Sequence, residues 1–110
     1  MDSIRRHILS NQNLNVHHAR QNRHILGSAG YVEGRSILNA DPEMLIGLYA
    51  GRPEPMIVRG RWNSRERFEH TDIIGTWINE DNTQMVPTNR GVFHYSNNGV
   101  HIVPASPERR

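Results

Sequence analysis

Two histidines and a serine near the end of the chain have the types and spacing for acid–base chemistry. His94 and Ser96 lie in one β-prone run and His101 lies in the next, with Asn97-Asn98-Gly99 between them. Short runs joined by such residues are typical of a β-hairpin. Side chains alternate across a strand, so the three polar residues share one face of this hairpin.

The turn has two possible positions that preserve these faces. If the turn is Asn98-Gly99, Ser96 pairs with His101. If it is Asn97-Asn98, His94 pairs with His101 directly. A three-residue loop would instead place the side chains of the two strands on different faces from those that a two-residue turn gives. Either two-residue turn leaves an apolar face that should be buried, formed by Phe93, Tyr95, Val100 and Ile102.

Two imidazoles on one face can cleave an RNA phosphodiester without a metal. One takes the proton from a 2′-hydroxyl, and the other protonates the departing 5′-oxygen. The hydroxyl of Ser96 could hydrogen-bond a phosphoryl oxygen. A solvated sheet face also often carries histidine for no catalytic reason, so the hairpin alone leaves both interpretations open.

Shorter segments add candidates for the same site. Thr88 and Arg90 precede the hairpin, where a hydroxyl could donate to phosphate and a guanidinium could neutralise transition-state charge. Arg35 and Ser36 form a similar pair earlier in the chain. His24 follows a helical pattern, and histidine is also common at helix C-termini, where the helix dipole favours it.

Several other kinds of site lack their usual sequence patterns. The chain has no cysteine, which excludes disulfides, zinc-thiolate sites and thiol nucleophiles. It has no His-Glu-x-x-His pattern, no paired carboxylate cluster, no Gly-x-Ser-x-Gly elbow and no phosphate-cradling glycine loop. We therefore expect neither a metal nor a cofactor.

The composition indicates one small domain. The chain has 110 residues and 35% hydrophobic residues, enough for a modest core. All 13 basic residues are arginine, which grips phosphate bidentately and stacks on bases, although a GC-rich genome would also favour arginine codons. The net charge of +2 permits an RNA partner but does not establish one. No apolar run approaches membrane-spanning length, so we expect no membrane partner.

The elements expected around these residues are helices first and strands later. Residues 1–24 predict a short helix, a break and a second helix ending near 23–24. Asp41 to Ala50 predicts a capped core helix with an apolar stripe of Met44, Leu45, Leu48 and Tyr49. Strands are expected at 56–59, 61–62, 67–70, 73–78 (a central strand), 84–86, 91–96 and 100–103. This order predicts an α+β fold with N-terminal helices packed on a four- to five-stranded antiparallel sheet.

The order of short motifs resembles the polymorphic toxin type 50 domain over roughly residues 20 to 105. The closing block from His94 to Pro104 carries most of this resemblance. The others, in order, are Gln21 to Ser28, Gly34-Arg35-Ser36, Asp41-Pro42, Tyr49-Ala50-Gly51, Ile74-Gly75 and Thr88-Asn89-Arg90.

The resemblance implies a ribonuclease toxin of the barnase/EndoU/colicin/RelE-like superfamily. It implies helices on a four-stranded antiparallel sheet, metal-independent RNA cleavage and a cognate immunity protein. On this interpretation 1–110 is one nuclease domain with a helical extension at 1–19, a core at 20–105 and a tail at 106–110. A parent toxin polypeptide or secretion apparatus would deliver it to the cytoplasm of a target cell, where a tRNA or an rRNA could be the substrate.

The site expected from all of this has His94 and His101 sharing the acid and base roles, with His24 competing for either. Arg35 and Arg90 would stabilise the transition state, and the hydroxyls of Ser36, Thr88 and Ser96 would hydrogen-bond phosphate. One alternative is a non-enzymatic nucleic-acid- or protein-binding module of a phage or secretion-system protein. A second alternative is a metal-dependent deoxyribonuclease.

Overall fold

Helices dominate the first half of the chain and strands the second, as the sequence predicts. The computed structural model describes residues 2–108. Its helices are α1 (Asp2–Asn11), α2 (His18–Gln21), the 3-10 turn η1 (Asn22–His24) and α3 (Pro42–Tyr49). Its strands are β1 (Ile37–Leu38), β2 (Glu54–Val58), β3 (Arg61–Glu69), β4 (Gly75–Ile78), β5 (Met85–Thr88), β6 (Arg90–Ser96) and β7 (Gly99–Pro104). The predicted α+β class is confirmed.

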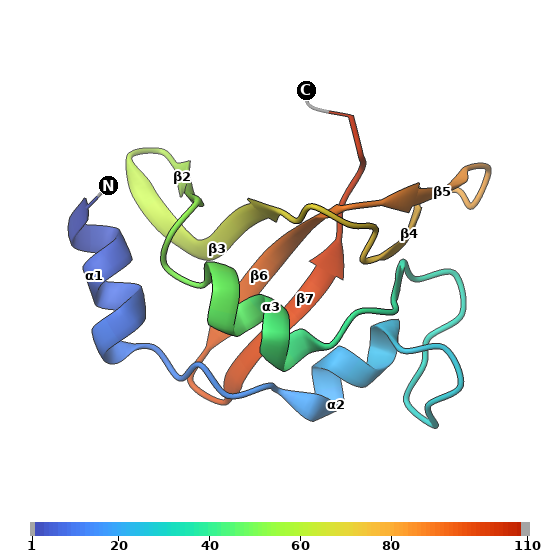
Figure 1. Ribbon diagram of the computed structural model, residues 1–110, viewed down its shortest axis with the longest axis horizontal. Helices are drawn as coiled ribbons and strands as arrows, with labels where there is room; N and C mark the ends of the chain where they lie inside the picture. Colours follow the sequence, from blue (N-terminus) through green and yellow to red (C-terminus); the bar gives the residue numbers. More distant parts are fainter. Residues whose placement is uncertain (1, 109–110) are drawn as a thin grey trace.

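The strands form two antiparallel sheets instead of one. The larger sheet has the order β2-β3-β6-β7 (Figure 1). The smaller sheet has the order β1-β4-β5. The strand expected at 73–78 is central, but in the smaller sheet. The strands expected separately at 61–62 and 67–70 are one strand, β3. It pairs with β2 on both sides of a register shift, and its residues from Arg65 to Glu69 also pair with β6.

The core lies on the inner face of the larger sheet. The side chains of Phe93, Val100 and Ile102 are fully buried there, and Tyr95 is 6% exposed, which confirms the predicted apolar face of the hairpin. Helix α3 crosses this face in front of β6 and β7 (Figure 1). Ile8 from α1 and Leu45 from α3 complete the same core cluster.

Helix α3 begins as predicted, but the side that it turns to the core differs in part from the predicted stripe. Asp41 caps it by accepting a hydrogen bond from the Glu43 backbone N–H at 3.0 Å, and proline occupies the first turn. Leu45 and Ile46 are buried, whereas two residues of the predicted stripe are partly exposed, Met44 at 37% and Leu48 at 46%. Leu45 is buried and Tyr49 packs against the core, so the predicted stripe was right for these two residues and wrong for Met44 and Leu48, because the helix buries Ile46 instead.

The N-terminal segment covers the free edge of β7. Val16 forms a parallel bridge with Val100, and the Val100 N–H donates to the Asn15 carbonyl at 2.8 Å. The Gln21 side chain continues this pairing by donating to the Ile102 carbonyl at 3.0 Å and accepting from its N–H at 2.7 Å. These hydrogen bonds pair backbone groups on the outer edge of β7 and hold η1 beside this strand.

Candidate active site

The C-terminal hairpin has its turn at Asn97-Asn98. Ser96 therefore pairs with Gly99, and His94 pairs directly with His101, which is the second of the two predicted registers. Gly99 has φ +127°, and a Cβ there would lie 2.5 Å from the Asn15 carbonyl oxygen. Glycine is required at this position because the N-terminal segment packs against it.

Three histidines form a row across the outer face of the larger sheet. The ring centroids of His94 and His101 are 4.7 Å apart. The ring of His24 stacks on His101 from the other side, at 6.2 Å and an interplanar angle of 16°. We call His94, His101 and His24 the histidine row. Arg65 on β3 is the register partner of His94, so a guanidinium adjoins the row at its far end.

A backbone carbonyl fixes the tautomer of His24. The His24 side chain is 4% exposed, and its Nδ1–H donates to the Ser36 carbonyl at 2.9 Å. In the neutral ring this leaves Nε2 as a hydrogen-bond acceptor. His24 is therefore set up to accept a proton at Nε2, in contact with the pair on the hairpin.

Burial keeps the histidine row neutral in the free protein. Burial and then the charge of Arg65 lower the pKa of His94 to about 4. Burial, followed by His94 and His24, lowers the pKa of His101 to about 3. Burial also lowers the pKa of His24, partly opposed by its bond to Ser36. A phosphate placed against these rings would raise all three pKa values, because a nearby anion favours imidazolium.

Two arginines near the row were not among the predicted site residues. Arg65 and Arg20 both act electrostatically on His94, and Arg20 also acts on His101. The spacing of Arg20 and His24, four residues apart in a helical pattern, was a usable signal. Arg65 had no local signal, because its pairing with His94 joins strands distant in sequence. Arg35, which was predicted, acts electrostatically on His24.

Two of the predicted hydroxyls are engaged inside the protein. The Ser36 Oγ accepts a hydrogen bond from the Ile78 N–H at 2.9 Å and donates to its carbonyl at 3.3 Å. The Thr88 side chain is fully buried and donates to the Ala105 carbonyl at 2.6 Å. These contacts join segments of the fold, so both hydroxyls are already used structurally.

The third predicted hydroxyl, that of Ser96, lies on the same face as His94 and two residues further along β6. It donates to the Gly99 carbonyl at 3.0 Å and so helps to close the hairpin. Across the strands Ser96 pairs with Gly99, and not with His101.

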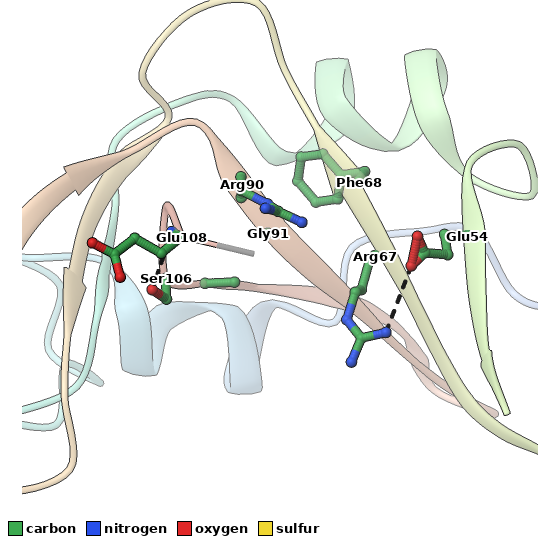
Figure 2. A pocket seen from close by; sticks show the side chains of 8 residues that line it. Glu54, Arg67, Phe68, Arg90, Gly91, Ser106 and Glu108 are labelled. Atoms are coloured by element: carbon green, nitrogen blue, oxygen red, sulfur yellow. Dashed lines mark hydrogen bonds and ion pairs between the residues drawn. The ribbon is translucent and has the colours of Figure 1, made fainter. Parts of the chain in front are cut away.

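Arg90 shares the outer face with His94 but lies four residues away, about 13 Å along the strand. It lines a pocket of about 260 Å³ together with Arg67, Glu54 and Glu108 (Figure 2). Arg67 forms an ion pair with Glu54 at 3.6 Å in this pocket. The structure thus places Arg90 apart from the histidine row, in a neighbouring part of the same face, and Thr88 buried at the end of β5 in the smaller sheet.

Among residues 2–108, no three His, Asp or Glu side chains are grouped so that they could hold a metal ion. Within the same residues, none of the helices combines the length and hydropathy that a membrane crossing requires. The histidine row, with Arg65 and Arg20 beside it, supports proton transfer by imidazoles next to arginine charge.

One family model matches most of the chain. The family model described as bacterial toxin 50 matches residues 16–104. The chain belongs to the bacterial toxin 50 family. The matched region includes the N-terminal segment that covers β7, the whole histidine row, Arg20 and Arg65, whereas α1 lies before it. No curated protein matches the chain. Membership identifies a bacterial toxin domain.

Proposed function

We propose that this toxin domain is a metal-independent endoribonuclease. It transfers an RNA phosphodiester to the neighbouring 2′-oxygen and leaves a 2′,3′-cyclic phosphate. The observation that carries the proposal is the line Arg65, His94, His101 and His24 across one sheet face. Two proton-transfer groups and an adjacent cation are the minimum this reaction needs.

The reaction needs one neutral imidazole and one protonated imidazole. The base removes the proton of the 2′-hydroxyl, the 2′-oxygen forms a bond to phosphorus, and the bond from phosphorus to the 5′-oxygen breaks. The acid then gives its proton to that 5′-oxygen. His94 and His101 share these roles, and His24 competes for the base role because its Nε2 is a free acceptor in a fixed tautomer.

The arginines supply the charge for the pentavalent transition state. Arg65 and Arg20 already act on the imidazoles, and Arg35 acts on His24, so all three could lie near a phosphate held against the row. Ser36 acts through its carbonyl as a positioning residue for His24. Arg90 and Arg67 lie along the sheet, where they could contact a phosphate further along the RNA.

Membership in a toxin family supports delivery into a target cell and a cognate immunity protein as partner. An immunity protein that blocked this site would place carboxylates opposite Arg65 and Arg20. A parent polypeptide or secretion apparatus would carry the domain to its target.

The test incubates purified protein with total RNA in the presence of a chelator. Cleaved RNA with cyclic-phosphate ends supports the proposal. Bound but intact RNA would indicate the non-enzymatic module, and metal-dependent cleavage of DNA would indicate the deoxyribonuclease. His94→Ala and His101→Ala should each lose at least about 100-fold in rate. The control is His7→Ala, an exposed histidine on α1. If both active-site variants cleave RNA at the wild-type rate, the assignment is wrong.

A further inference from the structure

A hollow of about 450 Å³ adjoins the end of the histidine row. Its wall includes His24 itself and Val103, which lies two residues beyond His101 on the same face of β7. The volume is within the range of small-molecule sites. A group seated here would therefore lie next to the reacting phosphate in the proposed mechanism.

The hollow is lined by the one tryptophan that the core does not use. Trp62 packs against Tyr95 at 5.6 Å and donates its indole N–H to the Arg65 carbonyl at 2.9 Å. Within residues 2–108, Trp77 has neither a ring contact nor a hydrogen bond through its indole. It is half-buried and borders the hollow. A flat apolar ring in this position is suited to stacking with a nucleobase.

The rest of the hollow combines acceptors with a guanidinium. Glu33, Arg35 and Glu80 line it, with Asn82 at the junction of two loops. Gly34 has φ +89°, and a Cβ there would lie 3.1 Å from the Asn82 Oδ1, so the loop around Gly34 packs directly on the Asn82 side chain. This contact holds the polar groups of the two loops around one opening.

We propose that this hollow is a guanine-binding subsite of the ribonuclease. The inference rests on the proposed function, because it assigns the base of the nucleotide whose 2′-hydroxyl attacks. Guanine is the only RNA base with a ring N–H and an amino group side by side on its Watson–Crick edge, and a carboxylate of Glu33 or Glu80 can accept both. Its O6 and N7 suit the guanidinium of Arg35. Trp77 stacks on the ring.

The first test measures binding without catalysis. Guanosine 3′-monophosphate is titrated into the protein by calorimetry, with the adenosine, cytidine and uridine 3′-monophosphates as comparisons. We expect the guanosine nucleotide to bind most tightly, and Trp77→Ala to weaken it about 10- to 100-fold. Trp77→Phe should retain most of the affinity because it keeps an aromatic face. Equal binding of the four nucleotides would overturn the proposal.

Two analogues separate the contacts, because each can first be compared with the guanosine nucleotide on the wild-type protein. Inosine 3′-monophosphate lacks the amino group, so its affinity should be lower than that of guanosine, and Glu80→Gln or Glu33→Gln should reduce this difference. The 7-deaza analogue of the guanosine nucleotide lacks N7, so it should bind more weakly than that nucleotide. This difference in affinity should depend on Arg35 and be smaller in Arg35→Gln. If neither analogue binds more weakly than the guanosine nucleotide, the assigned contacts are wrong.

Cleavage of defined oligonucleotides distinguishes failure of the subsite from failure of the function. Cutting after guanosine, with the preference reduced in Trp77→Ala, supports both proposals. Cutting after all four bases alike would overturn the subsite and leave the ribonuclease in place. Tight, Trp77-dependent binding of the guanosine nucleotide with no cleavage of any RNA would overturn the ribonuclease and retain the subsite.

Discussion

Replacing His94 and His101 together by asparagine should change how the stability of the protein depends on pH. Both rings are packed between strands and neighbours, and their folded-state pKa values are about 4 and 3. In the unfolded chain each would titrate near 6.5. As pH falls below 6.5, the unfolded state takes up protons that the folded state does not accept until near pH 4 and 3. The free energy of unfolding must therefore decrease over this range.

The size of the decrease follows from the two shifts. Near pH 5 the unfolded chain binds nearly two more protons at these sites, each worth about 1.4 kcal/mol per pH unit. Between pH 7 and pH 5 the two imidazoles together should reduce the free energy of unfolding by about 4 kcal/mol. The buried carboxyl of Glu66, whose pKa is raised by burial, acts in the opposite direction.

The assay is urea unfolding at pH 7 and pH 5, followed by tryptophan fluorescence. The free energy of unfolding of His94→Asn/His101→Asn should decrease between these two pH values by about 4 kcal/mol less than that of the wild type, whatever the stability of the variant at pH 7. Comparing the same protein at two pH values cancels the packing change, and comparing variants cancels Glu66. His18→Asn, at an exposed position on α2, is the matched control. If the double variant loses as much stability as the wild type, the two rings are not held neutral by the fold.

Three further predictions test the fold and the site. Gly75→Ala should lower the free energy of unfolding, measured with urea, by about 3 kcal/mol or more, because its Cβ would collide with the Ile37 carbonyl oxygen. The control is Gly47→Ala on the open face of α3, which should raise the free energy of unfolding by about 1 kcal/mol. Equal effects of the two substitutions would contradict the packing of β1 on β4. Gln21→Leu should lower the free energy of unfolding by about 2 kcal/mol in the same assay, because it leaves the backbone N–H and carbonyl of Ile102 without partners. An unchanged free energy of unfolding would count against the contact between Gln21 and Ile102. For RNA cleavage, kcat/KM should fall about tenfold per pH unit above pH 4, because the protonated imidazole of the free enzyme is lost. The kcat value should fall only at higher pH, because bound phosphate raises the imidazole pKa. A kcat/KM profile that is flat from pH 4 to 8 would exclude an imidazole acid.

Much of the hairpin could be predicted because its information is local. Alternation of side chains fixed the two faces, and the burial of Val100 confirms them. The position of the turn could not be predicted from the residues of the hairpin. It depends on Gly99, which must pass close to Asn15, a contact between segments more than 80 residues apart.

Helix α3 illustrates the same limit for packing. Its start was predictable because Asp41 and Pro42 act on the adjacent backbone. Its buried side was not, because Met44, Leu45, Ile46 and Leu48 are all apolar and only contact with the sheet selects among them.

The sequence by itself determined the α+β class, the shared face of His94 and His101, and the type of chemistry that their side chains can perform. Only the tertiary structure decided that His24 stacks on His101 and that Arg65 lies beside His94. It also showed that the hydroxyls of Ser36 and Thr88 are used within the fold. The physical reason is range: alternation and capping act between neighbours along the chain, whereas strand pairing and ring stacking join residues that only folding brings together.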